Sequence, residues 1–207
     1  RLSERDVPAE IVVEAMRLLN QTCVTLTHGQ YLDIGFERRN RVSVDEYLRM
    51  IEAKTAALIG TACEMGALIG AGDGEKRDHL RAFGRHAGLA FQMQDDVLGI
   101  WGEPEVTGKP VGADVLRRKK TLPLVHGLEH SGELRSLLAE GRPSEADLPR
   151  IRCLLDEVGS RRHAERSARE HYERALRALD AAALDSPGAD ALQELATMTD
   201  GTYPRLS

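Results

Sequence analysis

Apolar side chains recur at intervals close to 3.6 residues along almost the whole chain, which is the period of an α-helix. In the first segment this stripe consists of Ile11, Ala15, Leu19, Cys23 and Leu26. No segment alternates convincingly between apolar and polar residues, and no Asn-Gly hairpin turn occurs. The pattern therefore predicts an all-α protein.

Capping and turn residues divide this pattern into separate helices. Ser43 followed by Glu46 forms a capping box that opens a second helix. No internal repeat or low-complexity linker interrupts the chain, so we expect residues 1–207 to form a single helical domain. The expected helices run from the Asp6–Pro8 cap to about Gly35, from Ser43 to about Ile69, from about Glu75 to Ile100, onward from about Thr121, and over 145–158, 160–184 and 189–198, with a Gly- and Pro-rich loop over 102–112.

Composition and charge exclude several classes of protein. The 207 residues are 42% hydrophobic, which is enough for a sizeable core, and a net charge of −5 argues against a general nucleic-acid binder. The most apolar stretch, 56–72, is interrupted by Glu64 and is shorter than the roughly 20 residues that a membrane span needs. Three widely separated cysteines without a Cys-x-x-Cys pair indicate reduced thiols in a cytoplasmic protein. Because the chain starts at Arg1 and opens directly into a helix signal, we expect the first part of the natural polypeptide to be missing from it.

Two adjacent aspartates in the third helix are the strongest candidates for chemistry. Gln92, Asp95, Asp96 and Gly99 follow the spacing i, i+3, i+4, i+7 and share one face of the helix. Adjacent carboxylates in apolar surroundings repel each other and are costly to bury unless a cation offsets their charge. Mg²⁺ suits this position because it takes one or two protein carboxylates and completes its shell with water and phosphate oxygens. The alternative is that both aspartates lie on a solvated edge of the helix.

Basic residues elsewhere in the sequence fit a polyphosphate ligand. Lys109 and the run 117–120 follow the aspartates on a glycine-containing loop, where cations can neutralise phosphate oxygens, although such a run can also be a solvated surface feature. Lys54 lies in an apolar part of the second helix and either reaches solvent or points at an interior anion. Gln30 and Asp33 share a face near the end of the first helix, where Asp33 could also be simply solvated.

Four motifs follow one another along the chain in a specific order. They are Gly29-Gln30-Tyr31-Leu32-Asp33, then Lys54-Thr55, then Phe91-Gln92-x-x-Asp95-Asp96-x-Leu98, and then Gly108-Lys109-x-x-Gly112-x-Asp114 with Lys119-Lys120-Thr121-x-Pro123. This order resembles the trans-isoprenyl diphosphate synthases, or polyprenyl synthetases, and in particular the bacterial geranylgeranyl and farnesyl diphosphate synthases. The similarity covers essentially the whole chain, which matches the C-terminal two-thirds of that family.

The resemblance implies an isoprenoid-synthase helical bundle around a central apolar cavity, with its N-terminal helices missing here. It also implies a Mg²⁺-dependent prenyltransferase of isoprenoid biosynthesis. Such an enzyme condenses isopentenyl diphosphate with an allylic prenyl diphosphate and makes a C15–C20 or longer polyprenyl diphosphate. The expected partners are these two substrates and a second copy of the chain in a homodimer, with no nucleic acid and no membrane span.

The resemblance also carries roles over to single residues. Asp95 and Asp96 would hold Mg²⁺, with Asp95 the more direct ligand and a catalytic residue. Lys54, Lys109 and Lys119 would grip the allylic diphosphate, and Lys54 would also count as catalytic.

The remaining roles concern the cation and the cavity around it. Thr55 and Gln92 are expected to be catalytic, because they would steady the developing cation or take part in the proton relay. Gln30, Asp33 and Phe91 are expected to line the cavity.

Two departures from the family pattern keep other functions open. Gly99 stands where many members carry a third acid, and Asp95-Asp96 is the only adjacent aspartate pair in the sequence. The first aspartate-rich motif of the family is therefore absent, and the 207 residues alone are not expected to complete the metal site. The alternatives are a class I terpene cyclase on the same fold and a non-catalytic partner subunit of a prenyl synthase.

Overall fold

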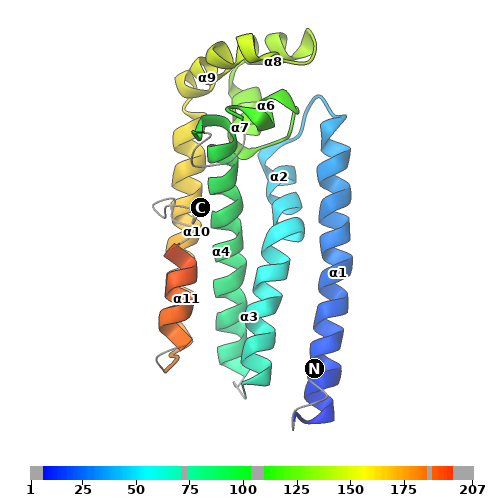
Figure 1. Cartoon of the computed structure of the whole chain (residues 1–207), viewed down its shortest axis with the longest axis vertical. Helices are drawn as coiled ribbons and strands as arrows, with labels where there is room; N and C mark the ends of the chain where they lie inside the picture. Colours follow the sequence, from blue (N-terminus) through cyan, green and yellow to red (C-terminus); the bar gives the residue numbers. More distant parts are fainter. Residues whose placement is uncertain (1–6, 71–73, 104–109, 186–187, 198–207) are drawn as a thin grey trace.

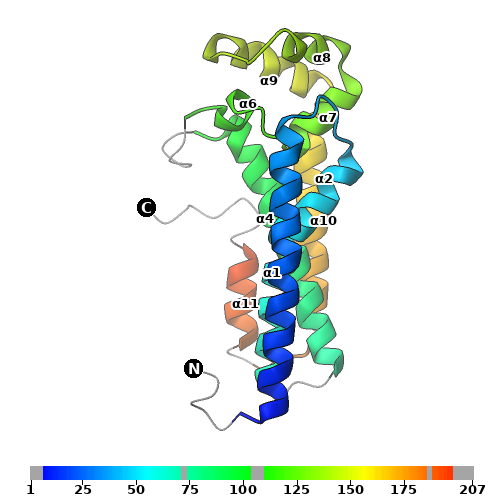
Figure 2. The same cartoon turned by 90° about the vertical axis from the view of Figure 1, so that its right-hand side faces the viewer.

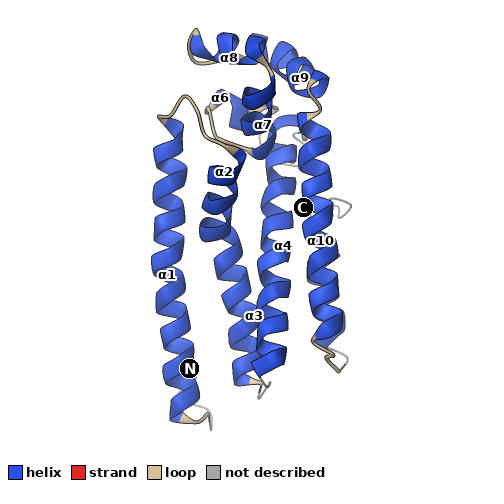
Figure 3. Cartoon of the chain, turned by 180° about the vertical axis from the view of Figure 1, so that it is seen from behind, coloured by secondary structure: helices blue, strands red, loops and turns tan. Residues whose placement is uncertain are grey.

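The computed structural model describes residues 7–70, 74–103, 110–185 and 188–197. Within these ranges the chain is helical and contains no β-strand, which confirms the all-α prediction (Figure 3). None of the helices in these ranges is long and apolar enough to cross a membrane. In chain order the elements are α1 (Ala9–Glu37), α2 (Val44–Ile51), the π-helical turn η2 (Glu52–Ala56), α3 (Ala57–Ile69), α4 (Gly74–Trp101), α6 (Ala113–Leu116), α7 (Leu122–His130), α8 (Gly132–Ala139), the 3-10 turn η3 (Glu145–Asp147), α9 (Leu148–Glu157), α10 (Ser160–Ala181) and α11 (Gly188–Thr197).

The long helices lie side by side along the longest axis of the molecule (Figure 1). α4 packs between α3 and α10, and α1 lies on the other side of the rod formed by α2, η2 and α3. The short helices α6 to α9 cover one end of this bundle, and α8 and α9 lie across it rather than along it (Figures 1 and 2). The C-terminal end of α4, where the aspartate pair lies, therefore ends beneath this cover.

Serine side chains cap the starts of α2 and α8. The Ser43–Glu46 capping box is present as predicted, with each side chain bonded to the other residue's backbone N–H. Ser131 accepts a hydrogen bond from the Leu134 backbone and starts α8, so the helix predicted from Thr121 is divided in two. Pro8 occupies the N-cap position of α1, and Asp6 lies outside the described residues. The short helix α6 forms in a stretch that the pattern did not assign to a helix.

A single π-helical turn joins α2 to α3 where the sequence predicts one continuous α-helix. This turn carries Lys54 and Thr55, and α1 packs directly against it. A Cβ added to Gly29 of α1 would lie 2.4 Å from the backbone nitrogen of Lys54 and 2.7 Å from the carbonyl carbon of Ala53. Only glycine permits this approach, so α1 supports the backbone of the turn itself.

Apolar side chains fix the covering helices to the end of α4. Ile100, Leu134, Ile151 and Leu155 are fully buried in one cluster that joins α4 to α7, α8 and α9. Each fully buried aliphatic side chain contributes about 1.5–3 kcal/mol relative to its exposed state. The segment between α6 and α7 is therefore held in a defined place beside the aspartate pair.

Candidate active site

Asp96 is a buried carboxylate, and both of its oxygens accept hydrogen bonds. It is 2% exposed, and its Oδ2 accepts hydrogen bonds from the Tyr47 hydroxyl at 2.6 Å and from the Leu122 backbone N–H at 2.8 Å. Its Oδ1 accepts a hydrogen bond from Gln92 Nε2 at 3.0 Å. The solvated-edge alternative is therefore wrong for Asp96, whose side chain is held in one orientation from three directions.

Burial dominates the ionisation of this group. Loss of water raises the pKa of Asp96 to about 6, although the hydrogen bonds from Tyr47 and Leu122 act in the opposite direction. Burial, followed by the charge of Asp96, raises the pKa of Tyr47 well above its usual range. The Tyr47 hydroxyl therefore keeps its proton and remains the donor. Leu122 begins α7, so the positive end of that helix also faces the carboxylate.

Asp96→Asn is expected to remove one pH-dependent contribution to stability. Because the folded-state pKa of Asp96 is raised, the folded chain binds this proton more tightly than the unfolded chain does. The resulting stabilisation is complete below about pH 4 and is lost as the pH rises through about 6. It amounts to about 3 kcal/mol. Urea unfolding between about pH 4 and pH 7 should show the variant gaining stability relative to the native chain by that amount.

The matched control for this pH dependence is Asp78→Asn, because Asp78 is an exposed aspartate on the same helix. We expect its stability to follow the native chain at every pH. A constant difference between Asp96→Asn and the native chain over the whole range would contradict the raised pKa.

Asp114 is a third carboxylate at this end of the bundle, and the sequence motifs assign it no role of its own. It is 4% exposed, and its Oδ2 accepts no hydrogen bond from the part of the chain that is described. A Cβ on Gly99 would lie only 2.1 Å from this oxygen. The missing side chain at Gly99 therefore lets the Asp114 carboxylate pack against α4.

Lys119 is the cation nearest to these carboxylates. Its Nζ lies 3.6 Å from Asp114 Oδ2. Burial lowers the pKa of Lys119, but the carboxylates around it, led by those of Asp114 and Asp96, raise it above the usual value. Lys119 therefore stays charged. Lys120 lines a separate cavity, and only Arg117 of the run 117–120 is exposed, so the solvated-run alternative is wrong for Lys120.

The π-helical turn brings two further candidates to the same region. Lys54 pairs with the carboxylate of Asp33, so Lys54 does point at an interior anion, and Asp33 is not simply solvated. Thr55 Oγ1 donates a hydrogen bond to Gln92 Oε1 at 2.9 Å, and Gln92 in turn donates to Asp96. A continuous chain of hydrogen bonds therefore connects the turn with the buried carboxylate.

The other predicted residues lie around this centre. Asp95 is half-buried beside Asp96, whereas Gln30 is exposed and Phe91 is 42% exposed. Lys109 lies outside the described residues. The cavity-lining roles of Gln30, Asp33 and Phe91 stay predictions.

Tyr47 is a buried hydrogen-bond partner of Asp96 that the sequence reasoning missed. A tyrosine within an apolar helix face signals a buried hydroxyl that needs a hydrogen-bond partner. The sequence gives no indication that this partner is Asp96, 49 residues further along the chain.

The donor set at this end of the bundle fits a Mg²⁺ ion held largely by water and phosphate. Asp96 already accepts three hydrogen bonds, whereas the buried Oδ2 of Asp114 accepts none from the described residues. No group of three or more Asp, Glu, His or Cys side chains within the described ranges is arranged to hold an ion. Mg²⁺ needs only one or two protein carboxylates. Asp95 and Asp114 are therefore the residues that would hold it, and Asp96 is better suited to positioning than to direct ligation.

Comparison with known proteins adds relatives along most of the chain. Residues 5–154 match the family model described as polyprenyl synthetase. The geranylgeranyl diphosphate synthase of Mycobacterium tuberculosis is 42% identical over 190 residues, which cover 89% of this chain and 54% of that protein. The (2E,6E)-farnesyl diphosphate synthase of Mycobacterium bovis is 39% identical over 199 residues, which cover 92% of this chain and 55% of that protein.

Solved structures show the same likeness in three dimensions. The geranylgeranyl pyrophosphate synthase of Corynebacterium glutamicum, in complex with isoprenyl diphosphate and magnesium, superposes with a TM-score of 0.86 at 28% identity, over 98% of this chain and 59% of that one. The polyprenyl synthetase of Streptomyces coelicolor A3(2) gives a TM-score of 0.82 at 37% identity, over 91% of this chain and 59% of that one. The chain thus spans somewhat more than half the length of these relatives.

Proposed function

Because this chain belongs to the polyprenyl synthetase family, we propose that it provides the allylic-diphosphate side of a Mg²⁺-dependent prenyltransferase. The enzyme condenses isopentenyl diphosphate with an allylic diphosphate and makes a C15–C20 or longer polyprenyl diphosphate. The observation that carries the proposal is that the charges of Asp114, Asp96 and Asp95 all act on Lys119, whose Nζ lies 3.6 Å from Asp114 Oδ2. A diphosphate leaving group requires positive charge in a partly buried site, which a charged lysine supplies directly and carboxylates supply by holding Mg²⁺.

The reaction begins when the C–O bond of the allylic diphosphate breaks, leaving an allylic cation and a diphosphate anion. The double bond of isopentenyl diphosphate then adds to the cation, and loss of a proton restores a double bond. Lys119 offers the departing diphosphate a fixed positive charge where little water screens it. When bound, Mg²⁺ would neutralise further charge on the diphosphate.

The π-helical turn supplies the polar groups next to this position. Lys54 is already directed at an anion, the carboxylate of Asp33, and an incoming diphosphate would compete with Asp33 for it. Thr55 and Gln92 present an ordered hydroxyl and amide, which suit the steadying of a cation or the movement of a proton. Asp96 positions Gln92 by accepting a hydrogen bond from its amide, and Tyr47 holds Asp96 in place.

A product assay tests this function. The natural polypeptide that contains residues 1–207 is purified and incubated with labelled isopentenyl diphosphate and dimethylallyl, geranyl or farnesyl diphosphate, with Mg²⁺ or with EDTA. We expect a linear prenyl diphosphate that forms only with Mg²⁺. A cyclic hydrocarbon formed from the allylic substrate alone would identify a class I terpene cyclase instead. Activity that requires a second, different chain would identify a non-catalytic partner subunit.

We also propose that a second copy packs against α1 to form a homodimer. Val13, Val24 and Tyr31 of this helix are 68%, 72% and 73% exposed, and their spacing places them on one face. α1 lies at the edge of the bundle with nothing in front of it in Figure 2. An exposed apolar face of this kind is typical of a protein–protein contact.

A cytoplasmic location is the third part of the proposal. Cys23, Cys63 and Cys153 all have free thiols, and Cys23 and Cys153 are exposed. Exposed free thiols fit a reducing compartment.

Lys119→Ala is expected to weaken Mg²⁺-dependent binding of diphosphate about tenfold or more, because it removes a charged hydrogen-bond donor. Lys120→Ala is expected to change it less than about twofold, because Lys120 lines a different cavity. Isothermal titration calorimetry with inorganic diphosphate and Mg²⁺ compares the two. The reverse order of effects would mean that Lys120 faces the site.

A further inference from the structure

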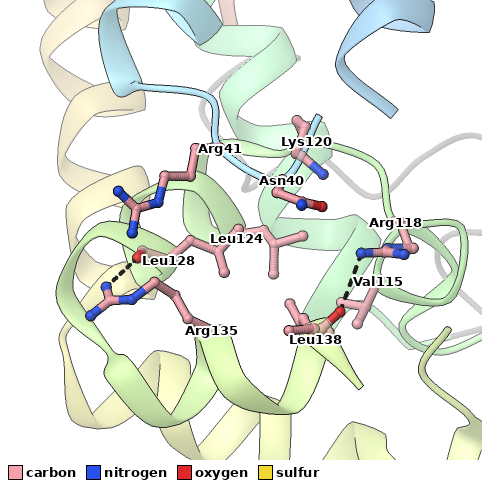
Figure 4. A pocket seen from close by; sticks show the side chains of 10 residues that line it. Asn40, Arg41, Val115, Arg118, Lys120, Leu124, Leu128, Arg135 and Leu138 are labelled. Atoms are coloured by element: carbon pink, nitrogen blue, oxygen red, sulfur yellow. Dashed lines mark hydrogen bonds between the residues drawn. The ribbon is translucent and has the colours of Figure 1, made fainter. Parts of the chain in front are cut away.

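A cavity lies beside the segment that joins α6 to α7, and Lys120 of that segment is part of its lining. It has a volume of about 210 Å³ and is enclosed by the turn between α1 and α2, this segment, α7 and α8 (Figure 4). Its lining contains four basic residues and no acidic one. The lining residues are Asn40, Arg41, Val115, Arg118, Lys120, Leu124, Leu128, Arg135, Leu138 and Ala139.

Lys120 is the central cation of this cavity. The residue is 6% exposed, and within the described ranges it has neither a hydrogen bond nor an ion pair. Burial, followed by the charge of Arg118, lowers the pKa of Lys120. A buried cation without a partner is costly, and an anion in the cavity would offset that cost.

The arginines leave donors available in the same space. Arg118 donates to the Leu138 carbonyl oxygen at 3.2 Å, and Arg135 donates to the Leu128 carbonyl oxygen at 2.6 Å (Figure 4). Each guanidinium carries five N–H groups, so most of them remain for a ligand. Arg118 also adopts a φ of 58°, a strained backbone conformation for a residue with a side chain.

Glu37 is the acidic residue whose charge raises the pKa of Lys120, but it is exposed and does not line the cavity. The acidic residues of the neighbouring space already have partners. An adjoining cavity of about 500 Å³ includes Glu46 and Glu129 in its lining. Glu46 pairs with Arg39 at 2.7 Å, and Glu129 accepts the backbone N–H of Val44 at 3.2 Å. The basic cavity therefore keeps an excess of positive charge.

Aliphatic side chains form the remaining wall. Val115, Leu124 and Leu138 are buried, and Leu124 faces the cavity between the basic residues (Figure 4). A volume of about 210 Å³ equals that of about seven water molecules. This is room for a diphosphate group with a short hydrocarbon substituent.

We propose that this cavity is a second anion-binding site, for a diphosphate group that is either free or attached to a short alkyl chain. Lys119 and Lys120 are consecutive residues, so the two sites lie back to back and share one stretch of backbone. The site requires no metal, because its four cations can neutralise a diphosphate directly. This feature separates it experimentally from the Mg²⁺-dependent site.

Calorimetry in EDTA tests the proposal with inorganic diphosphate and, in a second arm, isopentyl diphosphate. We expect one metal-independent site per chain, weakened at least tenfold by Lys120→Gln and several-fold by Arg41→Gln. Arg41 is exposed on a turn, so its substitution tests the site without disturbing the core. Arg117→Gln is the matched control, because Arg117 is exposed outside the cavity, and it should bind as the native chain does.

The two arms identify the source of the anion. Tighter binding of isopentyl diphosphate would mean that the aliphatic wall is used, and equal binding would identify free diphosphate as the ligand. The proposal is overturned if no binding occurs in EDTA, or if Lys120→Gln and Arg41→Gln both bind as the native chain does. It is also overturned if Lys119→Ala alone abolishes the binding, because the anion would then occupy the candidate active site.

Discussion

Asp95→Ala should abolish Mg²⁺-dependent diphosphate binding, with a loss of at least about 100-fold in affinity and no change in helix content. Removing a metal ligand leaves the bound ion without one of its few protein oxygens. Even the loss of a residue that only hydrogen-bonds a metal ligand lowers metal affinity about 10–100-fold. Asp95 is half-buried and lies outside the apolar clusters, so alanine is compatible with the fold. Titration with inorganic diphosphate or a bisphosphonate in Mg²⁺, together with circular dichroism, measures both effects.

Two further variants serve as a control and as a test of the role of charge. Asp78→Ala changes an exposed aspartate on the same helix and should bind as the native chain does. Asp95→Asn keeps the shape of the side chain and removes the charge, so it should lose most of the binding as well. Native affinity in Asp95→Ala would rule out Asp95 as a ligand.

Gly29→Ala should damage both stability and the site. The new methyl group would lie 2.4 Å from the backbone nitrogen of Lys54, and a backbone atom cannot rotate away as a side chain can. α1 must move, at a cost of about 1–3 kcal/mol in the free energy of unfolding. The π-helical turn loses its support, and a displacement of about 1 Å in a positioning group can cost about 100-fold in rate. Urea unfolding and the product assay measure the two losses.

Gly35→Ala is the matched control for this substitution. Gly35 lies on the same helix, and no atom lies within 4 Å of a Cβ placed there. The substitution should keep native activity and gain up to about 1 kcal/mol from helix propensity. If Gly29→Ala were equally harmless, the close packing of α1 against the turn would be wrong.

The helices could be predicted from the sequence because their signals are local. The capping box of Ser43 and Glu46 spans four residues, and the apolar stripe of α4 repeats within each pair of turns. Adjacent aspartates in an apolar helix also indicate a candidate site without reference to any distant residue. Each of these features can be interpreted from residues that are close together in the sequence.

Contacts between distant segments could not be predicted in this way. Tyr47 reaches Asp96 across 49 positions, and Asp114 packs over Gly99 only because α6 is held against α4. The sequence also gives no sign that consecutive lysines, Lys119 and Lys120, serve opposite sides of one segment. Tertiary packing decides each of these placements.

The π-helical turn Glu52–Ala56 has a consequence for insertions and deletions. In an α-helix, adding or removing one residue rotates everything beyond it by about 100° and misaligns one face with its neighbours. A π-helical turn contains one residue more than the α-turn it replaces, so losing one residue there would keep α2 and α3 in their present orientations. Such a deletion would redirect Lys54 and Thr55 while the rest of the bundle kept its packing. The orientation of Lys54 and Thr55 can therefore change in evolution without a change in the packing of the helices around them.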